Sequence, residues 1–341
     1  MVEHRVALIG LGMAVHPHAK SLVDLADRVE VTAAFSRTAT RREAFAKTFP
    51  FPGCDDLDAI SADESINAVM ILTPPNTHLD MVRRFATAGK HILLEKPLER
   101  STERAEALVN TVKAAGVRLG IVFQFRFRAA SERLKSAIDR GELGDLATVS
   151  VVCPWWRPQS YYNEPGRGTH ARDGGGVLMA QAIHTLDLML SLAGPVSEVS
   201  GLAATSAVHQ METEDFVGAG LRFASGAAGG LIATTASFPG RSERIEIVGT
   251  EATATLEAGH LRLAFRDGRT ETIGESHGSG GGADPMDFPH DSHRALLTDF
   301  LDALDQDRDP RATGEDGLRV QRLIDALLLS SSEKRSIMVT G

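Results

Sequence analysis

Short apolar runs alternate with longer amphipathic segments over the first third of the chain. Such runs are typical of strands that are buried on both faces of a sheet, and the segments between them have helical spacing. We therefore predict a doubly wound α/β domain with a parallel sheet. The predicted strands are residues 6–9, 29–35, 67–72, 92–94 and 118–123, and the predicted helices end near residues 25, 88 and 115.

Strands follow one another without intervening helices over much of residues 196–272. Such a run favours an antiparallel sheet, so we predict a second domain of the α+β class. A chain of 341 residues is also too long for one ordinary core. The predicted strands are residues 146–153, 217–223, 227–237, 244–249, 252–257 and 261–265, and the predicted helices are 129–140, 177–192, 294–304 and 317–331.

A glycine turn follows the first predicted strand. Gly10 and Gly12 are separated by one residue, and a helical pattern begins after Met13 and Ala14. A turn of this kind lets a pyrophosphate approach the backbone and the amino end of a helix. Val15 stands where the dinucleotide fingerprint has its third glycine or alanine, and two glycines after a strand could also form a tight turn without a ligand. We predict that this turn binds a dinucleotide.

The second predicted strand ends at Ser36 and Arg37 rather than at an acidic residue. A carboxylate at this point would bind the adenosine ribose of NAD, whereas Ser and Arg accommodate a 2′-phosphate. We therefore expect NADP to be favoured over NAD. An exposed helix start with scattered arginines would give the same pattern, and a Ser-Arg site also tolerates NAD.

Lys96 follows the predicted strand 92–94 and precedes Pro97, which cannot continue a strand because it has no N–H. In open α/β sheets, ligands bind outside the carboxyl ends of the strands, so Lys96 is a candidate site residue. A solvated loop lysine is the alternative. The other residues that we expect beside the cofactor also follow strand ends: Thr73, Pro74, Asn76, His78, Glu95 and Gln124.

Both tryptophans and both tyrosines of the chain lie in one short segment. Aromatic faces pack against the C–H faces of sugars, and Arg and Tyr side chains bind hydroxyl groups. The segment is therefore a candidate site for a polyhydroxylated or acidic substrate, with a subunit contact or a small apolar cluster as the alternatives. The candidate residues are Trp156, Arg157, Tyr161, Tyr162, Arg167 and His170.

Five motifs occur in one order and together resemble the glucose-fructose oxidoreductase and inositol dehydrogenase family. They are Gly10-Leu11-Gly12, Thr73-Pro74 through His78, Glu95-Lys96-Pro97, Gln124-Phe125-Arg126-Phe127, and Gly174-Gly175-Gly176 through His184 and Asp187. The resemblance implies an NAD(P)-dependent dehydrogenase or reductase of a sugar, cyclitol or related polyol. It also implies a dinucleotide-binding Rossmann domain over residues 1–122. Residues 123–341 would form an α+β domain whose open, mostly antiparallel sheet binds substrate and builds a homodimer or homotetramer.

The same resemblance assigns roles to single residues. Lys96 matches the family's active-site lysine, and His184 matches its histidine, for which a core position is the alternative. An imidazole near its usual pKa could take the hydroxyl proton as hydride leaves carbon. Arg126 and Asp187 are expected near the substrate. Ala180 stands where many members have an aspartate, so the sequence does not support an Asp-His dyad.

Composition narrows the classes of partner. The formal net charge of −9 argues against a nucleic-acid partner. Cys54 and Cys153 lack the spacing of a disulfide framework or a metal site, so we expect neither. No apolar run approaches the length of about 18 residues that a membrane span requires, and the first residues have no signal-peptide pattern. We expect a cytoplasmic protein without a membrane partner.

Two other functions remain open at this point. Ala180 motivates a nicotinamide-binding regulator that has the fold without the chemistry. An enzyme of the same fold could also use NAD cyclically in glycoside cleavage. The presence of Lys96 and His184 favours an enzyme over a regulator.

Overall fold

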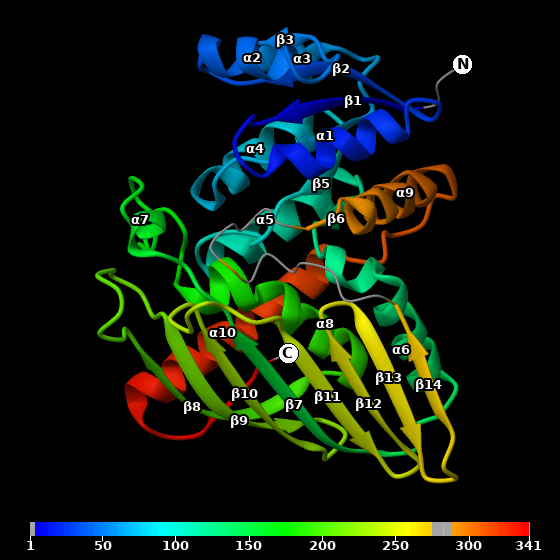
Figure 1. Ribbon diagram of the computed structural model, residues 1–341. Helices are drawn as coiled ribbons and strands as arrows, with labels where there is room; N and C mark the ends of the chain where they lie inside the picture. Colours follow the sequence, from blue (N-terminus) through cyan, green and yellow to red (C-terminus); the bar gives the residue numbers. More distant parts are fainter. Residues whose placement is uncertain (1–3, 275–281, 283–287, 341) are drawn as a thin grey trace. The chain divides into compact units, whose positions relative to one another are not determined.

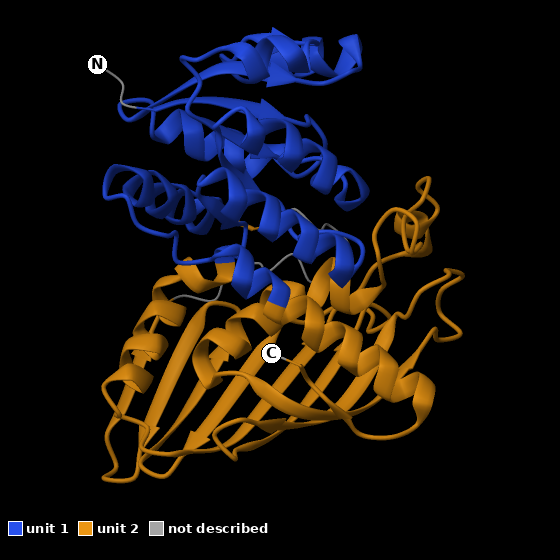
Figure 2. Ribbon diagram, turned by 180° about the vertical axis from the view of Figure 1, so that it is seen from behind, with its two compact units in different colours: residues 1–124, 290–318 blue, residues 125–289, 319–341 orange. Residues whose placement is uncertain are grey.

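The computed structural model describes residues 4–274, 282 and 288–340 (Figure 1). The chain divides into two compact units (Figure 2). Unit 1 comprises Met1–Gln124 and His290–Leu318, and unit 2 comprises Phe125–Pro289 and Arg319–Gly341. Each unit is built on its own sheet.

The sheet of unit 1 has six strands within the described residues, in the order β3-β2-β1-β4-β5-β6. Every neighbouring pair of these six runs parallel. This is the strand order of doubly wound dinucleotide-binding folds, so the predicted parallel α/β sheet is confirmed. The strands are β1 (His4–Ile9), β2 (Val29–Phe35), β3 (Gly53–Cys54), β4 (Ala68–Ile71), β5 (His91–Leu94) and β6 (Leu119–Ile121).

Helices connect these strands, as parallel pairing requires. Every residue of β4 is buried, which explains why this strand is a continuous apolar run. The pattern did not predict α2, β3 and α3, because these elements are short and α2 buries only Phe45. The helices of unit 1 are α1 (Val15–Asp24), α2 (Ala39–Ala46), α3 (Leu57–Ala62), α4 (His78–Thr87), α5 (Thr102–Ala115) and α9 (Asp291–Asp305), with a 3₁₀ turn, η1 (Pro75–Thr77), before α4.

Helix α9 lies in unit 1, although its residues fall within the predicted second domain. It packs against α1. Its last residue, Asp305, lies 2.8 Å from Nε2 of His4 and accepts a hydrogen bond of 2.9 Å from Arg28. These partners are far apart in sequence, so local periodicity could not predict that the chain returns to the first unit.

The sheet of unit 2 has nine strands within the described residues, in the order β14-β13-β12-β11-β7-β10-β9-β8-β15. Its described pairs are antiparallel except that β7 and β10 run parallel, so the predicted, mostly antiparallel sheet is confirmed. The strands are β7 (Leu146–Pro154), β8 (Val196–Ala204), β9 (Phe216–Phe223), β10 (Ala228–Thr234), β11 (Arg244–Gly249), β12 (Ala252–Glu257), β13 (His260–Phe265), β14 (Thr270–Ile273) and β15 (Ile337–Met338).

Helices α6, α8 and α10 lie against one face of this sheet (Figure 1, Figure 2). The alternation along β7 agrees with this, because Val149 and Val151 are buried whereas Thr148 and Ser150 are exposed. No described helix covers the second face, which is the open face of this sheet (Figure 1, Figure 2). The helices are α6 (Ala129–Asp139), α7 (Gln159–Tyr162), α8 (Ile183–Ala193) and α10 (Gly314–Glu333), and two short turns are η2 (Gln124–Phe127) and η3 (Leu178–Ala182).

No helix in the described part of the chain is long and apolar enough to cross a membrane. Among the same residues, no group of three or more His, Cys, Asp or Glu side chains is arranged to hold a metal ion. Both cysteines are free thiols. Burial raises the pKa of Cys153 to about 12, so this thiol stays protonated and unreactive at neutral pH.

Candidate active site

The glycine turn after β1 has the geometry of a phosphate-binding turn. Gly10 has a φ of +110°, and a Cβ there would lie 3.0 Å from the carbonyl group of Leu72, so only glycine fits. A Cβ at Gly12 would meet no described heavy atom within 4 Å. The backbone at Gly12 is therefore open to a ligand, as the second glycine of a dinucleotide turn must be.

Helix α1 begins directly after this turn. Its N-cap residue, Ala14, has no polar side chain to accept the first N–H groups, and the first turn contains no acidic residue. Val15 is buried, with 1% of its surface exposed, and fills the position of the missing third glycine, whereas Met13 is 43% exposed. The free N–H groups and the helix dipole favour a negatively charged group at this end, so the turn fits a pyrophosphate.

The end of β2 carries the predicted adenosine-ribose contacts. Ser36 is buried, and its hydroxyl accepts a hydrogen bond from the Thr38 backbone N–H at 3.3 Å. Arg37 is exposed. Arg42 donates to the Ser36 carbonyl at 2.6 Å and forms an ion pair of 2.8 Å with Asp55, which follows β3. Arg42 is therefore already paired with a carboxylate, and local sequence pattern did not predict this pairing.

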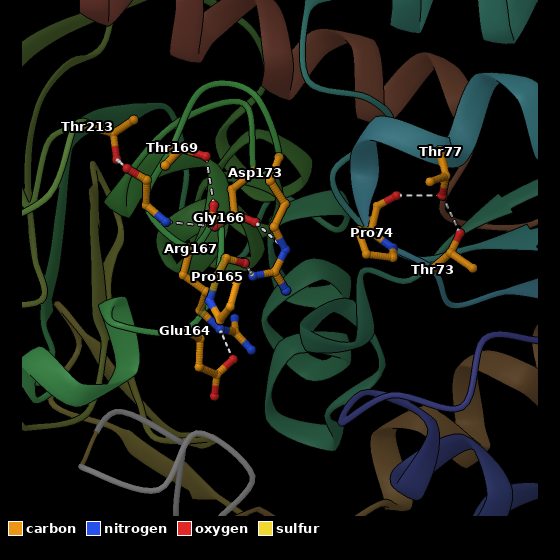
Figure 3. Close-up of polar contacts among 12 residues, drawn as sticks. Thr73, Pro74, Thr77, Glu164, Pro165, Gly166, Arg167, Thr169, Asp173 and Thr213 are labelled. Carbon is orange, nitrogen blue, oxygen red and sulfur yellow. Dashed lines mark hydrogen bonds and ion pairs between the residues drawn. The ribbon is translucent and has the colours of Figure 1, made fainter. Parts of the chain in front are cut away.

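The turn after β4 is held by short polar contacts (Figure 3). The Thr77 hydroxyl lies 2.7 Å from the Thr73 hydroxyl and 2.8 Å from the Pro74 carbonyl. Asn76 is exposed within η1. The turn thus has a fixed shape at the carboxyl end of β4, next to the glycine turn of β1 in the sheet.

His78, predicted to lie beside the cofactor, is surrounded by backbone carbonyl groups. It is fully buried, and its Nε2 lies 2.8 Å from the Thr73 carbonyl oxygen. Its Nδ1 lies 3.0 Å and 3.1 Å from the carbonyl oxygens of Pro97 and Leu98. Burial lowers the pKa of this imidazole, against the effect of the three carbonyl groups. His78 therefore joins the turn after β4 to the segment after β5, and its described bonds are all to backbone.

Glu95 and Lys96 follow β5. Nε2 of His18, on α1, lies 2.9 Å from Oε1 of Glu95, and Oε2 accepts the backbone N–H of Lys96 at 3.1 Å. Burial alone would raise the pKa of Glu95, but the bond to His18 and the charges of His18 and Lys96 hold it below its usual value. Lys96 is half-buried. Sequence reasoning missed His18, because no local pattern links it to a strand so far along the chain.

Gln124, predicted to contact the cofactor, follows β6 and is 7% exposed. Its Oε1 has no hydrogen-bond partner among the described residues. An amide oxygen that is buried without a donor is unfavourable, so this position suits a ligand that supplies one.

In unit 2, His184 lies at the start of α8 and is 8% exposed. Its ring lies 5.2 Å from the ring of Phe125, centroid to centroid. The turn before it, η3, is a π-helix and contains Ala180. The sequence pattern predicted one continuous helix here, because a single wide turn changes the apolar periodicity too little to detect. Such turns are frequent at functional sites.

Glu214 holds the amino end of this helical segment. Its carboxylate accepts the backbone N–H groups of Gly176 at 3.1 Å and Leu178 at 3.2 Å. A Cβ at Gly176 would lie 1.8 Å from the Glu214 carbonyl oxygen, so the position requires glycine. Burial raises the pKa of Glu214, in opposition to these N–H groups. No local pattern indicates this cap, because Glu214 comes from a different part of the chain.

Arg126 and Asp187, both predicted to lie near the substrate, bind each other. Nε of Arg126 donates to Oδ2 of Asp187 at 2.7 Å, and Nη2 donates to Oδ1 at 2.5 Å. Their side chains are 12% and 0% exposed. A two-point arginine–carboxylate pair of this kind fixes both groups, so it links η2 to α8 beside His184.

The aromatic segment is divided between the interior and the surface. Tyr162 is buried, with its hydroxyl 2.7 Å from that of Thr235, and burial raises its pKa well above the usual range. Arg157 is also buried and donates to the Trp156 carbonyl at 2.8 Å. The half-buried Tyr161 instead has its hydroxyl 2.8 Å from Nη1 of Arg167. The segment thus contains buried side chains as well as side chains that are partly exposed.

The loop that carries Arg167 is fixed by backbone contacts (Figure 3). The Thr169 hydroxyl donates to the Gly166 carbonyl at 2.7 Å, and the Gly168 N–H donates to Asp173 at 2.9 Å. The Thr213 hydroxyl donates to the Gly168 carbonyl at 3.0 Å. His170 is exposed on this loop.

Comparison with known proteins identifies the chain at this point. Residues 4–123 match the oxidoreductase family with an NAD-binding Rossmann fold, and residues 131–255 match the GFO/IDH/MocA C-terminal domain. The chain belongs to the GFO/IDH/MocA oxidoreductase family. The predicted family is therefore confirmed, and the protein is an NAD(P)-dependent dehydrogenase that acts on CH–OH groups.

Relatives within the GFO/IDH/MocA family cover nearly the whole chain. Inositol 2-dehydrogenase of Rhizobium meliloti (strain 1021) is 30% identical over 98% of this chain and 99% of its own. The scyllo-inositol 2-dehydrogenase (NAD(+)) of Bacillus subtilis (strain 168) is 30% identical over 80% of each. Among solved structures, the WlbA dehydrogenase of Bordetella pertussis, in complex with NADH and UDP-GlcNAcA, is 28% identical over 99% of both chains, with a TM-score of 0.85. These relatives give no support to a regulator or a glycoside hydrolase.

Proposed function

We propose that this member of the family transfers hydride between a nicotinamide cofactor and one carbon of a sugar, cyclitol or related polyol. Its inositol dehydrogenase relatives support this substrate class. The observation that carries the proposal is the fixed position of Lys96 at the carboxyl end of β5, in the same parallel sheet as the open turn at Gly12. Carboxyl ends of parallel strands meet at one edge, where such sheets bind their ligands.

Different residues of unit 1 would hold different parts of the cofactor. The glycine turn offers free backbone N–H groups to the pyrophosphate, and Ser36 and Arg37 would contact the adenosine ribose. Bound nicotinamide supplies the carbon that accepts or donates hydride. The other proposed contacts are Gly10, Gly12, Met13, Ala14, Thr73, Pro74, Asn76, Glu95, Lys96 and Gln124, with His78 holding the loop around them.

Two side chains would act on the reacting alcohol. The Lys96 ammonium would donate a hydrogen bond to the alcohol oxygen, and His184 would take the hydroxyl proton as hydride leaves the carbon. In the reverse direction, His184 would return the proton to the carbonyl oxygen. The proposed substrate contacts are Arg126, Trp156, Arg157, Tyr161, Tyr162, Arg167, His170 and Asp187.

We also propose a preference for NADP. The end of β2 has no acidic residue, and Arg37 is exposed there, whereas Arg42 is paired with Asp55. The test is to titrate the protein with NADPH and with NADH by fluorescence. An Arg37→Asp substitution should weaken NADPH binding roughly tenfold more than NADH binding. Equal affinities in the unaltered protein, or equal losses in the variant, would rule out the preference.

We also propose that the protein is cytoplasmic, and that it forms a homodimer or homotetramer through the open face of the unit 2 sheet. Leu202 and Ile232 are 61% and 47% exposed on neighbouring parts of this face, and Gly218 lies between them in the register. Flat apolar positions flanked by glycine suit face-to-face packing of two sheets. Sedimentation of the protein and of an Ile232→Glu variant tests this, since the variant should dissociate if the face is the interface.

The function itself is tested by cofactor binding followed by turnover. The protein is first titrated with NADH and NADPH and then supplied with aldoses, cyclitols and sugar acids while nicotinamide absorbance is recorded. Cofactor-dependent oxidation of at least one polyol is the expected result. Cofactor binding with no turnover of any polyol would contradict the proposal, and release of a free sugar without net cofactor reduction would reveal a cyclic hydrolase.

A further inference from the structure

The hydroxyl of Tyr161 receives two hydrogen bonds. Nη1 of Arg167 donates to it at 2.8 Å, and Nε2 of Gln181 donates to it at 3.4 Å. Guanidinium and amide N–H groups are donors only, so the phenol oxygen must accept both bonds. The proton of the Tyr161 hydroxyl takes part in neither bond and remains to be donated elsewhere.

In the described part of the chain, Gln181 has an unused hydrogen-bond acceptor, whereas Tyr161 has an unused donor. Gln181 lies on the π-helical turn η3, three residues before His184, and is 4% exposed. Its Nε2 is used by Tyr161, whereas its Oε1 has no hydrogen-bond partner among the described residues. A buried amide oxygen without a donor is unfavourable, and a ligand that supplies a donor would relieve this cost.

The surroundings hold both groups in place. The guanidinium carbon of Arg167 lies 4.3 Å from the centroid of the Tyr161 ring, and its Nε donates to Glu164 at 2.7 Å. The ring of Tyr162 contacts that of Tyr161 edge-on at 5.1 Å. A free donor and a free acceptor therefore lie side by side on rigid supports, as a recognition site requires.

We propose that Tyr161 and Gln181 together bind one hydroxyl group of the substrate and thereby determine which polyol is accepted. A hydroxyl accepts one hydrogen bond and donates another, so it matches the Tyr161 O–H donor and the Gln181 Oε1 acceptor at once. An ether or a carbonyl oxygen cannot donate, and a methylene group can do neither. This inference rests on the proposed function, because it assumes a polyhydroxylated substrate.

The test compares the polyol that the protein oxidises best with its monodeoxy analogues. In the unaltered protein, kcat/KM should fall about 100-fold for the one analogue that lacks the recognised hydroxyl, because the site is left with unpaired polar groups. Tyr161→Phe and Gln181→Leu should each lose about 10- to 100-fold on the parent polyol. Each variant should discriminate against that same analogue by less than about threefold, with cofactor affinity unchanged.

A Gln210→Leu variant serves as the matched control, since Gln210 is exposed in the same unit. It should keep the discrimination of the unaltered protein. The inference is overturned if Tyr161→Phe and Gln181→Leu lose the same factor on the parent and on every analogue, because the pair then serves only the fold or a bound water. Failure of the proposed function would give a different result, because the unaltered protein would then turn over no polyol. In that case polyol binding to the cofactor complex is measured by calorimetry for the unaltered protein and for Gln181→Leu. If neither binds a polyol, or if both bind it equally well, the inference is overturned as well.

Discussion

His18 and Glu95 form a buried hydrogen-bonded pair, with Nε2 of His18 2.9 Å from Oε1 of Glu95 and with 1% and 12% of the two side chains exposed. The ring of His293, on α9, meets that of His18 at 5.1 Å. The second oxygen of Glu95 accepts the Lys96 backbone N–H. One carboxylate therefore ties the helix that follows the glycine turn to the segment that carries Lys96.

Removal of this contact should destabilise unit 1. A His18→Ala substitution leaves the Glu95 charge buried without its partner, so we expect the free energy of unfolding to fall by about 3 kcal/mol. Urea denaturation followed by circular dichroism measures the change. His16, two residues earlier on the same helix, is exposed, and His16→Ala should cost no more than about 0.5 kcal/mol. Similar losses in the two variants would show that the pair is unimportant.

Lys96 should matter far more for turnover than for cofactor binding, because it is one of many proposed cofactor contacts. In a Lys96→Met variant we expect kcat/KM to fall about 1000-fold, because the alcohol oxygen loses its charged donor, while the cofactor dissociation constant changes less than about threefold. Steady-state kinetics and a fluorescence titration separate the two effects. Lys113→Met, which removes only an exposed ion pair with Glu315, should retain activity. A Lys96→Met protein with full turnover would remove Lys96 from the mechanism.

The Arg126–Asp187 pair should show strong coupling in a double-mutant cycle. Either Arg126→Met or Asp187→Leu alone leaves one buried charge and should cost about 3 to 5 kcal/mol of unfolding free energy. The double variant removes both charges and should be more stable than either single variant. Losses that simply add would mean that the two side chains contribute independently.

Glu214 should make stability depend on pH. Its pKa is raised in the folded state above the value of 4.5, so the folded protein holds this proton more tightly than the unfolded chain. The resulting stability is fully present below 4.5 and is lost as pH rises through the folded pKa. A Glu214→Gln variant keeps an oxygen to accept the N–H groups and has no charge to bury. Its unfolding free energy should therefore decline less than that of the unaltered protein as pH rises from 4.5 to neutral.

The matched control for this comparison is Glu212→Gln, because Glu212 is exposed two residues away. It should follow the pH dependence of the unaltered protein in the same urea titrations. If Glu214→Gln also follows that dependence, the Glu214 carboxylate does not control the pH response.

Much of the fold was predictable because it follows from local pattern. The buried runs of β1, β4 and β5 and the strand-helix alternation were enough to predict the parallel sheet, and Pro97 marked the end of the strand before Lys96. The motifs around Lys96 and His184 led to the correct family.

The environments of single side chains were less predictable, because their partners lie far away along the chain. His78 has the proline turn expected of a ligand contact, but both of its ring nitrogens lie within 3.1 Å of backbone carbonyl oxygens. Tyr162 and Tyr161 are adjacent in sequence, yet one hydroxyl faces the buried Thr235 and the other an arginine on a loop. Composition identified the aromatic segment, but it could not predict which of its side chains are buried and which are partly exposed.

The return of residues 290–318 to unit 1 limits how the protein can be divided. Neither unit corresponds to one uninterrupted stretch of the gene, because each is assembled from two separated stretches of chain. A fragment that stops at residue 124 would contain every strand of the parallel sheet but would expose the surface of α1 that α9 covers. It would also strip Arg28 of its two carboxylate partners, Asp302 and Asp305. An exchange of cofactor domains between relatives would thus have to replace both stretches of unit 1 together. Replacement of the first stretch alone would not be enough.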